Sequence, residues 1–164
     1  MDAPRRFEER LTGLFAPDVY RFGVPLFAVS GLCAGLDWTP AAVLVGGLGV
    51  FVAAFFRNPE RAIPEGDEKV VSPADGRVIA VGEVETSNGE KALRIGIFLS
   101  VFNVHVNRAP RHARVVDMHY QPGEFLNAMN PESALRNEFM WIGLEEPDAP
   151  HRRLAVRAIS GLIA

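Results

Sequence analysis

The side chains best suited to chemistry fall in two short segments, the first of which is VFNVHVNRAP, residues 101–110. In an extended chain, strict alternation would place Asn103, His105 and Asn107 together on one face. An imidazole titrates near neutral pH and can act as a general base or acid. A half-buried histidine that only bonds a neighbour explains the same pattern, so the rest of the chain has to decide.

The second segment is SPADGRV, in which Asp75 occupies a Pro-Ala-Asp-Gly turn. Aspartate before glycine is common in turns for conformational reasons alone. A carboxylate can also orient a histidine and fix the tautomer that serves as base. The three other histidines lack the spacing of metal ligands, and we expect no metal site: His112, His119 and His151.

The elements that must position these groups are mostly short strands. Residues 57–164 alternate β-rich runs with Pro, Gly and Asn, which predicts a compact β-rich domain. Asn88-Gly89 is typical of a hairpin turn, and Pro73–Gly76 predicts another turn. We expect extended chain at 70–71, 78–81, 91–108, 113–120 and 152–164. Residues 91–108 could form one long strand or two. Residues 126–139 are polar and contain Pro131, which predicts a loop with at most one helical turn.

Residues 1–56 differ in character, because two apolar runs at 22–36 and 40–56 are separated only by Asp-Trp-Thr. Helices of this length would reach about 22 to 26 Å, slightly short of a hydrocarbon core of about 30 Å. We therefore expect an N-terminal hydrophobic helical hairpin that either crosses a bilayer twice or enters and returns. A helical pair buried in a protein core is the alternative. The fold class expected for the whole chain is α+β, mostly β.

The arginines around the apolar runs predict an orientation. Basic residues flank the pair on both sides and are absent from its turn, which places both ends in the cytoplasm and the protein on the cytoplasmic side of the cell membrane. A cleavable signal peptide fits poorly, because a second apolar run follows the first at once. The arginines are Arg5, Arg6, Arg10, Arg21, Arg57 and Arg61.

The composition excludes some classes of function. The chain has 17 basic and 20 acidic residues, a net charge of −3, so no nucleic-acid partner is expected. The single cysteine, Cys33, lies in an apolar run and is assigned no redox role.

Five segments taken in order closely resemble the phosphatidylserine decarboxylase family, in its short bacterial and archaeal form. They are FFRNPERAIP, SPADGRV, FNVHVNRAP, YQPGEFLNA and RNE. The resemblance implies a proenzyme that cuts itself at a Gly-Ser bond, after which the serine becomes a covalent pyruvoyl group on a smaller partner subunit. It also implies conversion of phosphatidylserine to phosphatidylethanolamine and CO₂ through a Schiff base with that pyruvoyl group.

The resemblance also implies roles for individual residues. Asp75 and His105 match the family's turn aspartate and strand histidine, as orienter and base of self-cleavage, and His105 is the candidate proton donor to the substrate. Arg108, Asn107 and Glu138 are candidates for binding the substrate. Glu138 could equally stabilise a loop, and Gly123 in YQPGEFLNA would give a tight backbone approach.

Two departures from the family pattern bear on these roles. Longer members carry two histidines three residues apart, whereas this sequence has His105 and Arg108. His105 therefore serves both steps, or Arg108 takes a substrate-binding part, or Arg108 simply faces solvent. The 164 residues also contain no Gly-Ser pair, Ser160-Gly161 being the reverse order. We expect the pyruvoyl-forming serine in a following segment, without which the chain should not process itself.

Two other classes of function remain open. SPADGRVIAVGEV also resembles the strand-turn-strand of biotinyl and lipoyl carrier domains, with Lys91 near the hairpin tip. That pattern offers no explanation for FNVHVNRAP. A non-catalytic, membrane-anchored scaffold with the same fold is the second alternative. The oligomeric state is left open, a homo-oligomer included.

Overall fold

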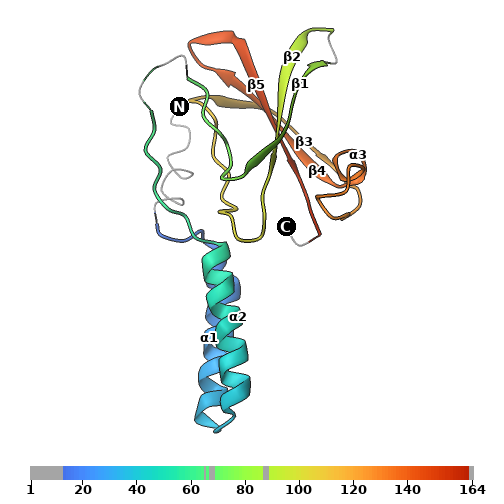
Figure 1. Ribbon diagram of the computed structural model, residues 1–164. Helices are drawn as coiled ribbons and strands as arrows, with labels where there is room; N and C mark the ends of the chain where they lie inside the picture. The colour runs from blue at the N-terminus through green and yellow to red at the C-terminus, as the bar shows by residue number, and fades with distance from the viewer. Residues whose placement is uncertain (1–12, 65, 67–68, 87–88, 163–164) are drawn as a thin grey trace. The chain divides into compact units, whose positions relative to one another are not determined.

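The computed structural model describes residues 13–64, 66, 69–86 and 89–162. The fold is α+β and rich in β-structure, as predicted (Figure 1). The elements in chain order are α1 (Asp18–Gly35), α2 (Thr39–Phe55), β1 (Arg77–Glu85), β2 (Lys91–Phe98), β3 (Arg114–Gln121), α3 (Ser133–Arg136), β4 (Phe139–Glu146) and β5 (Ala149–Ile159).

The chain divides into two compact units. The first holds the helical hairpin and the chain up to Ile63, together with two short segments from later in the sequence, Ala74–Gly76 and Phe102–Val106. The second holds the strands and α3. The predicted domain boundary between residues 56 and 57 stays a prediction. The two segments that carry Asp75 and His105 thus belong to the same unit as the hairpin.

The predicted helical hairpin is confirmed, with each helix beginning slightly earlier than expected. Helices α1 and α2 lie side by side (Figure 1) and are joined through Asp37, whose φ of 59° is left-handed. Small residues allow close packing between them: a Cβ on Gly49 would lie 3.0 Å from the Phe27 ring. The Ser30 hydroxyl donates a hydrogen bond of 2.8 Å to the carbonyl oxygen of Ala42 across the helix pair.

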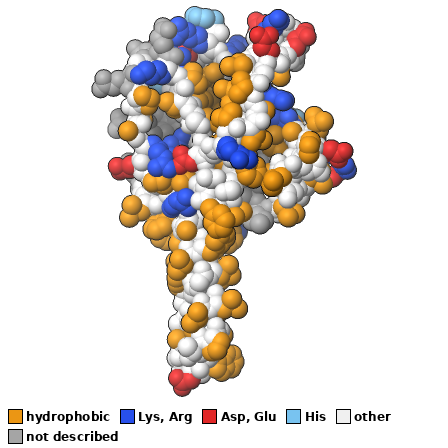
Figure 2. Space-filling view, in the orientation of Figure 1, with side chains coloured by type: hydrophobic (Ala, Val, Ile, Leu, Met, Phe, Trp, Pro, Cys, Tyr) orange, Lys and Arg blue, Asp and Glu red, His pale blue; other side chains and the backbone are white. Residues whose placement is uncertain are grey.

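The outer surface of the hairpin is apolar (Figure 2). Its large exposed side chains include Phe22, Val24, Phe27, Val29, Leu32, Leu36, Val43, Leu44, Leu48, Val50 and Phe51. Within the described ranges, neither helix combines the length and apolarity needed to span a bilayer. Arg5, Arg6 and Arg10, which contribute to the predicted orientation, lie outside the described residues.

The second unit contains two antiparallel sheets. Strands β1 and β2 form the predicted hairpin, in which Arg77 pairs with Phe98 and Glu85 with Lys91. Asn88 of the predicted turn lies outside the described residues, and Gly89 has a φ of 80°. The other sheet has the order β3-β4-β5. Strands β3 and β5 confirm the predictions for 113–120 and for most of 152–164, and α3 is the single helical turn allowed in the polar loop. Strand β4 was not predicted.

The prediction of a strand through His105 is wrong. Strand β2 ends at Phe98, and residues 99–113 contain no strand. The side-chain alternation fails as well, since Phe102 is 75% exposed whereas Val104 is 3% exposed. The predicted extended pair at 70–71 is likewise not part of a strand. Two backbone hydrogen bonds join residues 71–73 to residues 108–110: the Arg108 N–H donates to the Pro73 carbonyl oxygen, and the Val71 N–H donates to the Pro110 carbonyl oxygen. Neither proline has an N–H that could continue the pairing as a strand ladder.

Candidate active site

The segment that leaves α2 closes the base of the hairpin. Asn58 is buried, and its side-chain amide donates to the Gly13 carbonyl oxygen at 3.1 Å. Its backbone N–H donates to the Leu14 carbonyl oxygen at 2.7 Å, and Phe15 pairs with Arg57 in an antiparallel bridge. The FFRNP motif therefore fixes the first residues after the helix against those before it.

His105 lies on this closed end of the hairpin. Its ring stacks on that of Phe55, the last residue of α2, with 4.0 Å between the ring centroids and 19° between the planes. Its Nδ1–H donates to the carbonyl oxygen of Asn103, at 3.0 Å. A neutral imidazole with its proton on Nδ1 has its free lone pair on Nε2. Nε2 is therefore the nitrogen that can accept a proton.

The surroundings of His105 favour this neutral form. Partial burial lowers the pKa of His105 below its ordinary value, and the charge of Arg57 lowers it further. The hydrogen bond to Asn103 raises this pKa, but its effect is smaller than that of burial. The Arg57 guanidinium also donates to the carbonyl oxygens of Ala54 and Phe102, at 2.7 Å each. Arg57 thus ties the end of α2 to the segment that carries the histidine.

Asp75 lies in the predicted turn at Pro73–Gly76. Its carboxylate accepts hydrogen bonds from Arg61, one of them from Nε to Oδ1 at 3.4 Å. This ion pair raises the pKa of Arg61. The acceptor of the Nδ1–H of His105 is the carbonyl oxygen of Asn103. The roles assigned to Asp75 and His105 stay predictions.

The three predicted substrate-binding residues belong to the second unit. Asn107 is exposed and Arg108 is partly buried. The Glu138 carboxylate accepts a hydrogen bond of 2.7 Å from the Tyr120 hydroxyl, which raises the pKa of Tyr120. Their roles toward a substrate stay predictions.

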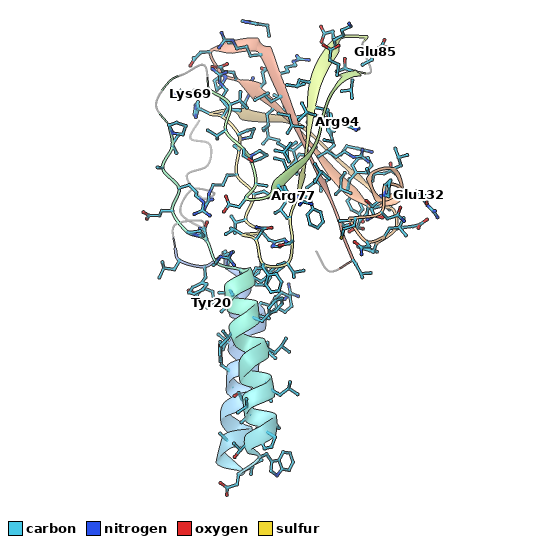
Figure 3. All side chains as sticks on the ribbon, viewed as in Figure 1. Tyr20, Lys69, Arg77, Glu85, Arg94 and Glu132 are labelled. Carbon is cyan, nitrogen blue, oxygen red and sulfur yellow. The ribbon has the colours of Figure 1, made fainter. Side chains whose placement is uncertain are left out.

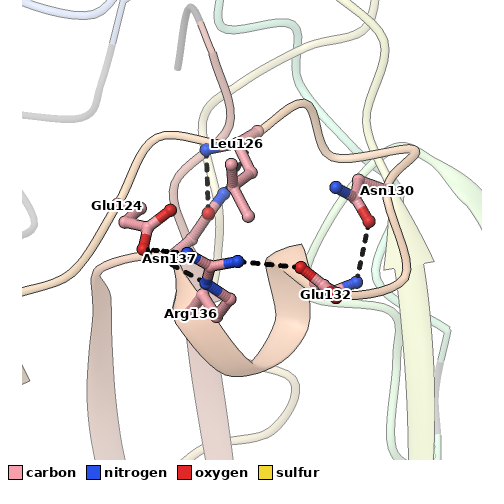
Figure 4. Close-up of polar contacts among 6 residues, drawn as sticks. All are labelled: Glu124, Leu126, Asn130, Glu132, Arg136 and Asn137. Atoms are coloured by element: carbon pink, nitrogen blue, oxygen red, sulfur yellow. Dashed lines mark hydrogen bonds and ion pairs between the residues drawn. The ribbon is translucent and has the colours of Figure 1, made fainter.

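Sequence reasoning missed the importance of Asn137, which is 1% exposed. Its side-chain oxygen accepts from the Leu126 N–H at 2.8 Å (Figure 4). Its amide donates to the carbonyl oxygens of Leu126 and Ser160 at 2.8 and 2.7 Å. One side chain therefore connects the loop after β3 to the end of β5. The available signal was the RNE motif, which was considered only for its glutamate.

The tight backbone approach predicted at Gly123 is confirmed. A Cβ at this position would lie 2.5 Å from the Arg136 carbonyl oxygen and 2.5 Å from the Glu138 nitrogen. Arg136 adds ion pairs with Glu124 at 2.6 Å and Glu132 at 2.9 Å (Figure 4). The YQPGEFLNA and RNE motifs thus meet and organise one corner of the second unit, which we call the Asn137 corner (residues 122–138).

All of these motifs lie in the part of the chain that matches a known protein family. The family model described as phosphatidylserine decarboxylase matches residues 48–164. The chain belongs to the phosphatidylserine decarboxylase family. It is 46% identical over 136 residues to a phosphatidylserine decarboxylase proenzyme of Rhodopirellula baltica, covering 83% of this chain and 57% of that protein.

Two further relatives carry the same name, phosphatidylserine decarboxylase proenzyme. That of Symbiobacterium thermophilum is 46% identical over 90% of this chain and 70% of its own length. That of Syntrophotalea carbinolica is 43% identical over 86% of this chain and 66% of its own length. The chain thus spans between 57 and 70% of the lengths of these three relatives. Family membership accounts for FNVHVNRAP, which the carrier-domain alternative does not explain.

Proposed function

We propose that this chain forms the larger part of a phosphatidylserine decarboxylase, which removes the serine carboxylate as CO₂ and replaces it with a proton to give phosphatidylethanolamine. The observation that carries the proposal is the setting of His105 in a chain of this family. The imidazole is held on two sides, by the Phe55 ring and by the Asn103 carbonyl oxygen, and no described residue bonds to its Nε2.

His105 fits the proton transfers that the activity requires. A base that deprotonates a serine hydroxyl for self-cleavage must be neutral near pH 7, and partial burial together with Arg57 favours the neutral imidazole. The same nitrogen, once protonated, can return a proton to the carbon that loses CO₂. Arg61 forms an ion pair with the Asp75 carboxylate, which belongs to the same unit as His105. We propose that this carboxylate stabilises the imidazolium formed during each transfer.

The residues present also suit a pyruvoyl group, because its formation from serine needs a base nearby and the imidazole of His105, stacked on Phe55, can supply one. When bound, a pyruvoyl group supplies an electron-withdrawing carbonyl that accepts the electron pair released on decarboxylation. His105 is the residue of this chain that we expect beside it. Arg108, Asn107 and Glu138 are proposed to bind the charged groups of the lipid head.

We propose that the hairpin inserts into the cytoplasmic face of the cell membrane. Its outward side chains are apolar along both helices (Figure 2), an exposure that is unfavourable in water. Tyr20 lies near the base of α1 (Figure 3) and Trp38 at the opposite end, 66% and 62% exposed, and such aromatic residues favour bilayer interfaces. His105, at the base, would then act at the depth of the lipid headgroups.

The test uses the protein expressed from its full-length reading frame in membranes. Intact-mass measurement should find two fragments, the smaller with an N-terminal pyruvoyl mass, and the purified protein should release CO₂ from phosphatidylserine vesicles. His105→Ala should slow self-cleavage by about 10³-fold. His112→Ala, which removes an exposed histidine seven positions away, should cleave at the parental rate.

Two results would contradict the proposal. A parental protein that stays uncleaved and releases no CO₂ would favour the membrane-anchored scaffold instead. Cleavage that proceeds normally in the His105→Ala protein would retain the enzyme but remove His105 from its first step.

A further inference from the structure

The ring on which His105 stacks is itself held firmly by the hairpin. Phe55 contacts Phe56 edge-to-face, with 5.2 Å between centroids and 77° between planes. Phe51, one turn earlier on α2, lies 6.4 Å from Phe55 between centroids. Phe56 in turn stacks on Phe22 of α1 at 6.0 Å. The position of the Phe55 ring is therefore set by the packing of both helices.

The backbone around His105 offers little comparable support. Residues 99–113 contain no strand or helix, so no regular ladder fixes the direction of this side chain. The hydrogen bond from Nδ1 to Asn103 fixes one point of the imidazole but leaves the ring free to turn about that bond. A flat aromatic face at 4.0 Å removes this remaining freedom, because it fixes the plane of the ring. The two contacts together determine where Nε2 points.

We propose that Phe55 is a positioning residue for His105, and that the hairpin, through this ring, sets the efficiency of the histidine as a base. The inference rests on the proposed function. It adds Phe55 to the residues that support the reaction, and it connects the hairpin to the activity of His105. Phe55 reaches the reaction only through the imidazole. The lipid-inserted element and the base are connected by one ring contact and by the Arg57 bonds to Ala54 and Phe102.

The test measures the first-order rate of self-cleavage of the full-length protein in phospholipid vesicles. Phe55→Leu keeps an apolar side chain but removes the flat face, and should slow cleavage by about tenfold to a hundredfold. Phe55→Tyr restores the ring and should cleave within about threefold of the parental rate. Phe27→Leu, a matched change on α1 of the same hairpin, should also cleave at nearly the parental rate.

A second readout separates positioning from general destabilisation of the hairpin. Phe55→Ala opens the imidazole to water, so the pKa of His105 should rise toward its ordinary value of about 6.5. The acid limb of the rate profile should therefore move to higher pH in Phe55→Ala and stay in place in Phe27→Leu. A loss of folded protein alone lowers the amplitude of cleavage without moving this limb.

Several outcomes would overturn the inference. Phe55→Leu cleaving at the parental rate, Phe55→Tyr as slow as Phe55→Leu, or Phe27→Leu equally slow would each show that stacking is not what matters. These results differ from a failure of the proposed function, in which the parental protein itself is not cleaved and the inference falls with it.

Discussion

The segment around His105 and the Asn137 corner both carry motifs of the family, yet they are held in opposite ways. Asn137 is 1% exposed and its side chain makes three hydrogen bonds to backbone groups. His105 is only partly buried and, within the described part of the chain, makes one hydrogen bond through Nδ1 and rests on one ring. In the first arrangement both polar atoms of the central side chain are bonded, whereas in the second no bond to Nε2 of the histidine is found among the residues that the structure describes.

This difference separates motif residues that stabilise the fold from motif residues that can take part in a reaction. A side chain whose polar atoms are all bonded to backbone stabilises the fold and has nothing left for a substrate. A side chain held at one atom and one face can still exchange a proton. Substitutions in the Asn137 corner should therefore change stability, and substitutions around His105 should change rate and pH dependence.

The largest effect on stability is expected at Asn137. Asn137→Ala leaves the Leu126 N–H and two carbonyl oxygens without their partner and should lower the free energy of unfolding by about 3 kcal/mol. Urea denaturation monitored by tryptophan fluorescence measures the change. Asn130→Ala removes an exposed bond to the Glu132 N–H and should cost less than about 1 kcal/mol. Equal costs for the two variants would break the comparison.

The next effect is expected at Gly123. A methyl group there meets backbone atoms at 2.5 Å, so Gly123→Ala must shift the chain and should cost about 2 kcal/mol. The melting temperature of this variant should fall clearly below that of Gly82→Ala, because a Cβ at Gly82 meets no atom within 4 Å. A Gly123→Ala protein as stable as its Gly82→Ala control would contradict the close approach.

A smaller change in stability, together with a change in pH dependence, is expected at Arg57. Arg57→Met removes two hydrogen bonds and should cost about 1 kcal/mol. It also removes a charge that lowers the pKa of His105, so the acid limb of self-cleavage should move to higher pH. Arg57→Lys keeps the charge and should leave the limb closer to its parental position. Identical limbs in all three proteins would exclude this electrostatic effect.

The smallest effect concerns stability and pH. Because the pKa of His105 is lowered in the folded state, the unfolded chain binds more protons between the folded pKa and about 6.5. The contribution of His105 is therefore fully present above about pH 6.5 and is lost as the pH falls through the folded pKa. Denaturation midpoints of the parental and His105→Gln proteins at pH 5 and 7.5 measure it. A parental protein no more sensitive to acid than His105→Gln would contradict the prediction.

Much of the architecture could be predicted because it depends on local pattern. The two apolar runs with a short polar connection gave the hairpin within a few residues of its observed ends. Asn88-Gly89 between alternating runs gave the β1-β2 pair, and Pro131 limited the helical content of the polar loop to α3. The strand β4 was missed because its eight residues follow that loop directly; it pairs with β3 from before the loop on one side and with the adjacent β5 on the other.

The candidate site could be predicted in residue type but not in geometry. Alternation around His105 suggested a strand, but an extended segment becomes a strand only when neighbours provide a continuous ladder, and Pro73 and Pro110 interrupt it here. The contact between Phe55 and His105 joins residues 50 positions apart, and no spacing within either motif predicts it. The bond from Nδ1 to Asn103 depends on the irregular backbone itself.

The stack on Phe55 also constrains how α2 can change in length over evolution. Each residue of an α-helix turns the chain by about 100°, so a single insertion in the middle of α2 rotates one half of the helix relative to the other. Either the close approach of Gly49 to Phe27 or the stack of Phe55 on His105 would then be lost, because one of the two residues would face another direction. Lengthening this helix should therefore be tolerated in steps of about whole turns, and one-residue insertions should be selected against.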